Sequence, residues 1–599
     1  MTGKLSRRQL FKIIALRNTN SEDTLLAKYR RKVYNGRRYV DANATATDLN
    51  RKVAISSGIE TYKGVWTDKE VIHLLKRTLF GFKVGDINSF VLNGLDKTVD
   101  QLLNYIDKAP SPPINNYQNT YKDEGGVTYG ADWTTNAFSN NSIGNTTNFY
   151  REMSLANWST GMALNQENNI REKMLWFWYH LIPIDFETVK ASAGSNSSRI
   201  CYDYLKFMRS NALGNFKLII RNIATQPAMM YYLNNQVNTK NAPDENFARE
   251  IMELFTLGKG SANTFSESDV VQAAKVLTGW RVQNLNQFPT TTTFVSSLHD
   301  TSNKVFSSFF NNTAINSNGQ AELDAFISML FSKEQEVSEY ICRRLYRYFV
   351  YYDIDASIEL NVIKPLAKIF VASNWEIKPV LWTLFRSQHF FDTANRGVYI
   401  KSPFDLVLGS LRTFNIGYNV PDPSNFDAQY SLWRYFNTSI MKPMEQSMGE
   451  IPNVSGWNAF YQAPSYHEYW INSNTVQKRY SFLNIIFNGI SPTYNGLKVK
   501  IEVDVIAWVS QFPKNIIENP NLLVNNCITI LLPLDLSKSV KDSLKVQNLL
   551  SNQINDSYWT VAWLNYVNSP TNVTYASVVK TRLKGLLMSI TQLAEYQLM

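Results

Sequence analysis

The sequence predicts a mainly α-helical protein, built as one large helical array with long loop insertions. Two observations lead to this prediction. Apolar residues recur at steps of three and four along several stretches, which is the spacing of one face of an α-helix. Polar segments that contain Pro and Gly interrupt this pattern in three places, where helices should stop. We find no repeat of fixed period, so the sequence does not indicate a solenoid.

Positive charge is concentrated in the first residues. Residues 1–52 hold thirteen Lys and Arg against four acidic residues, an excess of nine out of a net charge of +10 for the whole chain. We therefore divide the chain into a basic N-terminal arm, residues 1–52, and a single large helical domain, residues 53–599. Cations interleaved with tyrosines suit contact with nucleic acid, an anionic surface or an acidic protein. The arm residues expected to bind are Arg7, Arg8, Lys28, Arg30, Arg31, Lys32, Arg37 and Arg38.

The start of the arm, from Ser6 to Lys12, resembles the twin-arginine export motif. A working signal also needs an apolar stretch of about 7–15 residues, and here the stretch that begins at Ile13 ends at Arg17. We therefore expect an uncleaved N-terminus and prefer a cytoplasmic location, with export as a folded protein as the alternative. No apolar run approaches the roughly 18 residues that span a bilayer, so no transmembrane segment is predicted.

Three stripes of apolar residues mark the clearest helices of the body. A stripe of this kind packs against neighbouring helices. The residues are Val71, Leu74, Leu75, Thr78 and Leu79; then Ile327, Leu330 and Phe331; then Ile341, Leu345, Tyr348 and Phe349. The predicted long loops lie between such stripes, at residues 110–147, 284–319 and 415–473. In the second loop, β-branched and aromatic residues predict a short β-hairpin over residues 291–308.

Residues 243–280 should form two consecutive helices. Asp244 suits a helix start and Gly258 a left-handed stop, so residues 245–257 form the first helix. Ser266 can cap the second helix, with Asp269 completing a variant capping box.

The first of these helices carries the candidate catalytic and metal-binding residues. Glu250 and Glu253 face the same way, and His299 with Asp300 could reach them from the loop, which gives oxygen ligands and one imidazole. Arg249 could orient an anionic group, or it could belong to a structural lattice of Arg and Glu spaced four residues apart. No His-x-x-x-His, Glu-x-x-His or His-Glu-x-x-His pattern is present. We favour the structural lattice, with a metal or acid/base site and then a phosphate or sulfate site as alternatives.

Other features of the sequence argue for or against particular classes of site and enzyme. Trp457 and Trp470 could form a binding lip, although a loop pinned by aromatic rings is favoured. The three cysteines lie far apart without a Cys-x-x-Cys pair, which argues against a disulfide framework and a structural zinc site. The sequence lacks Gly-x-Ser-x-Gly, Walker and Gly-x-Gly-x-x-Gly motifs, which argues against a serine hydrolase and a nucleotide enzyme. No motif requires a cofactor.

Several blocks of the sequence resemble a bacterial family called domain of unknown function 1800. The most specific are residues 244–258, which end in Glu-Leu-Phe-Thr-Leu-Gly, and Leu-Thr-Gly-Trp at 277–280. The resemblance covers roughly residues 70–590. Further blocks are Leu74 to Gly81, Arg171 to Met174, Phe177 and Trp178, Leu213 to Phe216, Pro227 to Met229, Tyr232 and Leu233, His299 and Asp300, Pro452 to Trp457, Trp470 to Asn472, and Arg479.

The resemblance to this family implies expectations about metal binding and about a partner protein. Members of the family commonly read Phe-Trp-His-x-His, whereas this chain has Tyr179 and Leu181 at the two imidazole positions, so a metal bound by that pair would be lost. Genes of the family often lie beside genes for an exported, sulfatase-like family. We therefore expect a non-enzymatic interaction or assembly component of an envelope-associated complex, with a sulfatase-like exported protein as partner. The alternatives are a metal-assisted hydrolase acting on an anionic or carbohydrate substrate, and binding of nucleic acid or an anionic surface by the arm.

Overall fold

A computed structural model describes residues 33–35, 38–40, 57–105, 109–138, 142–258, 264–417, 419–494 and 496–599. In the arm it gives the backbone of two short paired strands, β1 (Val33–Asn35) and β2 (Arg38–Val40). The predicted binding side chains of the arm lie outside the described part of the chain.

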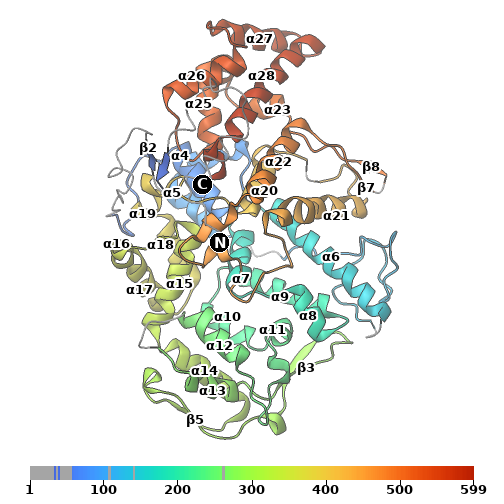
Figure 1. The fold of residues 1–599 in the computed structure, drawn as a ribbon, viewed down its shortest axis with the longest axis vertical. Helices are drawn as coiled ribbons and strands as arrows, with labels where there is room; N and C mark the ends of the chain where they lie inside the picture. The colour runs from blue at the N-terminus through green and yellow to red at the C-terminus, as the bar shows by residue number, and fades with distance from the viewer. Residues whose placement is uncertain are drawn as a thin grey trace.

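The body is mainly helical, which confirms the predicted fold class (Figure 1). The helices of its first half are α4 (Asp68–Thr78), α5 (Ile87–Leu103), α6 (Ser142–Leu164), α7 (Arg171–Leu181), α8 (Phe186–Ala193), α9 (Ser197–Ser210), α10 (Phe216–Ile223), α11 (Pro227–Tyr232), α12 (Glu245–Met252), α13 (Glu267–Val276), α14 (Glu322–Phe331) and α15 (Glu334–Phe349). The second half contains α16 (Ala356–Ile358), α17 (Lys364–Ala372), α18 (Ile377–Phe385), α19 (Gln388–Phe391), α20 (Pro403–Thr413), α21 (Phe426–Arg434), α22 (Thr475–Asn488), α23 (Val505–Val509), α24 (Lys514–Glu518), α25 (Pro520–Leu531), α26 (Lys538–Leu544), α27 (Ser557–Asn568) and α28 (Val573–Thr591).

Helix α4 shows how the local sequence sets an element. Thr67 caps its start and forms a capping box with Glu70, which satisfies backbone N–H groups that the first turn leaves free. The predicted stripe of this helix is buried, from Val71 to Thr78. Helix α4 lies beside α25, close to the end of the chain, so the two ends of the body meet (Figure 1).

The short β-strands pair differently from the prediction. Strands do occur at both ends of the predicted 291–308 hairpin, at β4 (Thr291–Phe294) and β5 (Lys304–Val305). However, β4 pairs with β3 (Trp280–Gln283), and β5 pairs with β6 (Ala314–Ile315), both antiparallel. A third pair in the body joins β7 (Thr493–Tyr494) to β8 (Leu497–Lys498). The sequence therefore predicted the strands at these two places, but the predicted pairing between them is wrong.

The third predicted loop, residues 415–473, was also partly wrong. It contains helix α21 and a π-helical turn, η9 (Tyr435–Met441), which continues it. Apolar residues such as Leu432 and Phe436 are buried there, so packing supports a helix that the surrounding polar residues obscured.

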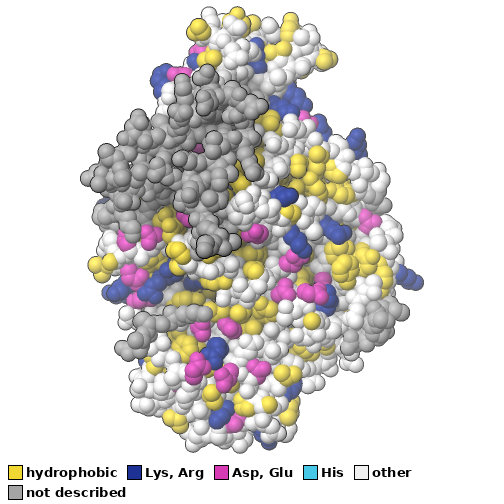
Figure 2. All heavy atoms as spheres, in the orientation of Figure 1, with side chains coloured by type: hydrophobic (Ala, Val, Ile, Leu, Met, Phe, Trp, Pro, Cys, Tyr) yellow, Lys and Arg dark blue, Asp and Glu magenta, His cyan; other side chains and the backbone are white. Residues whose placement is uncertain are grey.

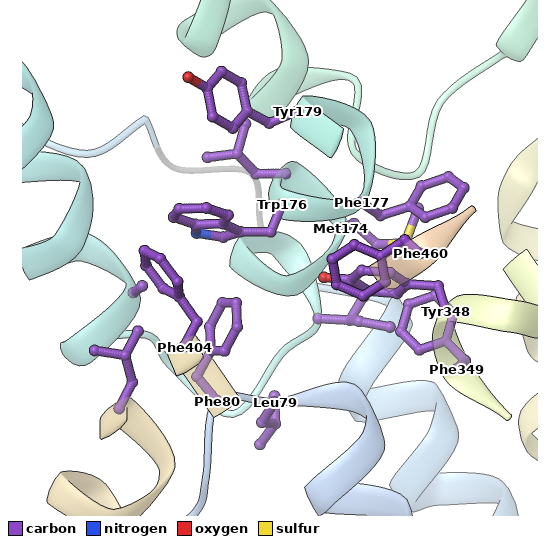
Figure 3. Packing of buried hydrophobic residues seen from close by; sticks show 14 of the residues in the cluster. Leu79, Phe80, Met174, Trp176, Phe177, Tyr179, Tyr348, Phe349, Phe404 and Phe460 are labelled. Carbon is purple, nitrogen blue, oxygen red and sulfur yellow. The ribbon is translucent and has the colours of Figure 1, made fainter. Parts of the chain in front are cut away.

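The buried apolar side chains join in one hydrophobic cluster, in which aromatic rings are prominent. Figure 3 shows part of it: Trp176 from α7 packs on Phe404 from α20 with ring centroids 3.8 Å apart. Phe177 from the same helix packs on Tyr348 of α15 at 5.4 Å. The abundant Tyr, Phe and Trp residues therefore serve packing to a large extent.

The surface of the body matches its nearly neutral charge. On the face in Figure 2, basic and acidic side chains are interspersed without one dominant patch. Within the described residues, no helix is both long and apolar enough to cross a membrane. Cys201, Cys342 and Cys527 are free thiols, and all three are buried.

Candidate functional site

Arg249 of α12 contacts two acidic residues, Glu245, which is one of its expected i,i+4 partners, and Glu267 of α13. Its guanidinium lies 3.1 Å from Glu245 Oε2, one helical turn earlier. It also donates two hydrogen bonds, of 2.8 and 2.6 Å, to the carboxylate of Glu267 at the start of α13. The hydrogen bond to Glu267 and the nearby acids raise the pKa of Arg249. Arg249 therefore joins the ends of two helices, at a position that is one-third exposed.

Glu250 in α12 and Glu253, which follows it, lie near Tyr340 of α15. Both carboxylates contribute to the raised pKa of Tyr340, although burial of that ring is the main cause. The Tyr340 hydroxyl donates a 2.7 Å hydrogen bond to the carbonyl of Leu254. This contact lies in η3 (Glu253–Leu257), a π-helical turn that continues α12 to the predicted stop at Gly258.

His299 belongs to a separate buried cluster. Its Nδ1 lies 2.9 Å from the carbonyl oxygen of Thr278, and its Nε2 lies 2.9 Å from Glu322 Oε1. Glu322 also pairs with Lys304 at 2.6 Å, and the side chains of His299, Lys304 and Glu322 are almost fully buried. Because both ring nitrogens of His299 already have partners, the imidazole is not free to bind a metal ion in this arrangement.

The same cluster explains why a Thr-Gly-Trp block and a His-Asp block occur together. The backbone N–H of Asp300 donates to Thr278 Oγ1 at 2.9 Å. Gly279 has φ of 89°, and a Cβ there would come within 3.1 Å of His299 Cβ. Glycine therefore lets the loop approach the end of α13. The hydroxyl of Thr278 then holds that loop in place.

The four predicted metal ligands thus fall into two groups. Glu250 and Glu253 lie near Tyr340 of α15, whereas His299 and Asp300 are tied to the end of α13 and to α14. Among the described residues, no group of three or more His, Cys, Asp or Glu side chains is arranged to hold a metal ion. In the described structure, His299 and Asp300 fix their loop to the end of α13.

Trp457 and Trp470, the predicted lip, lie inside the protein. They are 3% and 2% exposed. Trp457 packs on Trp176 with centroids 5.8 Å apart, and Trp470 packs on Phe460 at 5.6 Å. In this arrangement the rings fix the surrounding loop to the core.

A surface that the sequence reasoning missed lies at the other end of the molecule, on the hairpin of α27 and α28 (Figures 1 and 2). We call residues 554–578 the C-terminal hairpin surface. Of the sixteen large apolar side chains that are exposed in the described structure, seven belong to it. They are Ile554, Tyr558, Val561, Val567, Val573, Tyr575 and Val578.

Helix α27 is attached to the body by its opposite face. Trp559 and Trp563 are buried and stack on each other at 5.9 Å. Trp559 Nε1 donates a 2.7 Å hydrogen bond to the carbonyl of Ile517, and Thr560 Oγ1 donates one of 2.8 Å to that of Glu518. These contacts with α24 hold the hairpin in place and leave Tyr558 and Val561 facing outward.

Little charge belongs to the hairpin surface itself, although Arg582 of α28 donates a 2.5 Å hydrogen bond to the carbonyl of Tyr558. Between residues 546 and 579 the sequence contains a single ionisable acid or base of the Asp, Glu, Lys and Arg types, Asp556. Lys545 pairs with this carboxylate at 2.8 Å, and Asn521 donates to it at 2.7 Å. This run of residues without charge was the signal in the sequence that could have revealed the surface.

The comparison with protein families supports the resemblance. The profile of the family described as "Protein of unknown function (DUF1800)" matches residues 73–598. The chain belongs to this family. No curated protein and no solved structure matches the chain. The DUF1800 match includes both signature helices and the C-terminal hairpin, so both are parts of the family region.

Proposed function

We propose that the protein is a non-enzymatic interaction or assembly component that docks a partner through the C-terminal hairpin surface. The observation that carries this proposal is the concentration of exposed apolar side chains between residues 554 and 578, a stretch in which Asp556 is the single Asp, Glu, Lys or Arg; the cations Lys580, Arg582 and Lys584 follow it in α28. Exposed apolar residues scattered singly are normal, but a cluster on one projecting element is typical of a binding surface.

The chemistry of the surface favours a protein partner over a lipid surface. Helices that bind membrane interfaces carry Lys and Arg on their polar face. Here the exposed polar residues beside Val561 are uncharged, for example Asn565 and Asn568. Exposed tyrosines with few charges match the core of a protein interface, which is depleted of charged residues and enriched in aromatic ones. We therefore infer a partner with an apolar groove that accepts a helical hairpin.

The family setting suggests which partner to test first. The gene neighbourhood that the resemblance implies points to a sulfatase-like exported protein, and hence to an envelope-associated complex. This part of the proposal rests on the resemblance and not on the geometry of the hairpin.

The test is co-purification of the full-length protein from its native host after mild cross-linking. Val561→Asp places a charge on the hairpin surface at a side chain that is 53% exposed, so the fold should be affected little. We expect this variant to lose its partner. Val305→Asp is the matched control, because Val305 is 56% exposed but lies on β5, far from the hairpin (Figure 1).

Two outcomes would contradict the proposal. One is a partner that both variants retain, and the other is a wild-type protein that purifies alone under cross-linking. Binding of the wild-type protein to protein-free vesicles, abolished by Val561→Asp, would replace the protein partner by a membrane.

A further inference from the structure

A second feature lies in the interior of the protein. Five Lys and Arg side chains gather there between α4, α7, α20 and α22. They come from segments up to about 400 residues apart in the sequence, and several lie in the blocks that resemble the family. The residues are Lys76, Arg77, Lys173, Lys401 and Arg479. We call them the buried basic cluster.

Some of these cations have only part of their hydrogen-bonding capacity filled. Arg479 donates to Gln597 Oε1 at 2.8 Å and to the carbonyl of Lys401 at 2.7 Å, yet its Nη1 is buried without a partner among the described residues. Arg77 likewise donates through Nη2 to the carbonyl of Asn395 at 3.0 Å, while its Nε and Nη1 have no partner in the described structure. Buried donors left in this state are costly.

Lys76 is the extreme case. Its Nζ is buried and has no hydrogen-bond partner among the described residues. Burial lowers the pKa of Lys76 well below its usual value, and the nearby charge of Lys401 lowers it further. Lys401 itself donates to the carbonyl of Tyr596 at 2.7 Å and lies 4.0 Å from the centre of that ring.

Negative charge in the cluster is scarce. Asp405 is the side-chain carboxylate that attracts Arg77, Lys401 and Arg479, and it is already bound. Lys173 pairs with its Oδ1, and Ser402 donates to its Oδ2 at 2.8 Å. Arg77 also donates to the main-chain oxygen of Met599 at 2.8 Å, and Asp405 alone does not balance the five side chains when all of them are protonated. A further anion would therefore be stabilised here.

The cluster opens onto a cavity that can hold such an anion. Lys76, Lys401 and Asp405 line it, and its volume is about 30 Å³. Since a cavity needs about 10–15 Å³ to hold one water molecule, this one is larger than a single water requires. A sugar or nucleotide is too large for it. Gly81 and Gly409 form part of the wall.

The two glycines explain how the cavity is built. Gly81 has φ of 77°, and a Cβ there would lie 2.7 Å from the carbonyl oxygen of Gly409. Only glycine at position 81 allows the end of α4 to approach α20 this closely. Lys76 and Lys401 are thereby brought to the same cavity.

We propose that this cavity binds a small inorganic oxyanion of the phosphate or sulfate class, with Lys76 Nζ as its principal ligand and Lys401 as its neighbour. The anion would give Lys76 the hydrogen-bond acceptor that it lacks, and charge-assisted hydrogen bonds of this kind are the strong ones. This inference is independent of the hairpin surface and would hold if no partner docked there.

The experiment is equilibrium dialysis of the full-length protein with phosphate and, separately, with sulfate, at constant ionic strength set by chloride. We expect saturable binding of at least one of the two anions, and competition between them if both bind. Lys76→Met should weaken binding by at least about tenfold. Lys69→Met is the matched control, because Lys69 lies on the same helix but is exposed, and it should bind as the wild type does.

Absence of saturable binding of either anion up to the millimolar range would overturn the proposal, as would equal affinity in Lys76→Met. If Lys76→Met fails to fold, crystals of the wild-type protein grown with selenate decide the question. An anomalous selenium peak beside Lys76 Nζ supports the site, and a cavity without that peak refutes it.

Discussion

At the scale of single residues, some buried charged side chains form ion pairs and others do not. Arg151 and Asp123 form two hydrogen bonds, of 2.8 and 2.7 Å, between fully buried side chains. Arg209 and Glu172 do the same at 2.9 and 3.1 Å. Lys76, in contrast, has no such partner in the described structure. Paired buried charges maintain a fold, whereas unpaired ones often mark a binding site.

Burial makes Lys401 a source of pH dependence. Burial, and to a lesser extent the charge of Arg479, lower its pKa to about 7, while Asp405 acts in the opposite direction. Below that pH, Lys401 is charged in both the folded and the unfolded chain, so the penalty for burying the charge is present in full. Between about pH 7 and the pKa of the unfolded chain, only the unfolded chain keeps the proton, so stability rises with pH.

We therefore predict that Lys401→Met flattens this rise. Relative to the wild type, the variant should be most favoured near pH 6 and should lose that advantage as the pH approaches about 9. The measurement is the thermal unfolding midpoint of both proteins across this range, in a buffer without oxyanions. A difference between the two midpoints that does not change with pH would show that Lys401 stays charged in the folded protein.

At the scale of elements, the sequence predicted the helix starts that depend on contacts between residues close together in the chain. Asp244 accepts from the N–H of Asn246 at the start of α12, and Ser266 and Asp269 form the predicted capping box of α13. The partners of the strands could not be predicted, because pairing of β4 with β3 depends on how the chain folds back after Trp280. The Glu267 contact of Arg249 was missed for the same reason, since it crosses between two helices.

A glycine in the loop after α21 provides a test of local geometry. Gly456 has φ of 81°, and a Cβ there would lie 2.4 Å from the carbonyl oxygen of His180. Gly126 has a similar φ of 73° but no atom within 4 Å of such a Cβ. Gly126→Ala therefore reports the cost of left-handed backbone alone, about 1–2 kcal/mol.

Gly456→Ala adds a steric clash to that cost. We expect it to reduce the free energy of unfolding by about 1–3 kcal/mol more than Gly126→Ala does. Thermal unfolding midpoints of the two variants give the comparison. Equal losses would mean that the loop moves away from His180 freely, and that the Gly-Trp pair of this block is not held as the structure describes.

At the scale of the whole molecule, the helical fold class and the family were both available from the sequence. The C-terminal hairpin surface had a signal in the sequence, the run of residues without charge, but the buried basic cluster had none, for a physical reason. Lys76, Lys173, Lys401 and Arg479 meet only because α4, α7, α20 and α22 pack together, and no spacing along the chain records that. The two-part division into an arm, residues 1–52, and a single body, residues 53–599, stays a prediction, as does the binding of anions by the arm.

The three buried cysteines offer a way to time the opening of the body. Cys201 lies in α9, Cys342 in α15 and Cys527 in α25, so they sample the middle and the end of the chain. Burial raises the pKa of each thiol, and only an exposed thiolate reacts with an alkylating reagent. The alkylation rate of each cysteine therefore reports how often its own helix opens to solvent.

If residues 53–599 open as one cooperative unit, the three cysteines should become accessible to the reagent at the same rate. We predict a common rate of alkylation under native conditions, read peptide by peptide by mass spectrometry. A Cys527 that reacts much faster than the other two would show that the C-terminal helices come apart on their own. The C-terminal hairpin surface would then belong to a segment that can unfold while the rest of the protein stays folded.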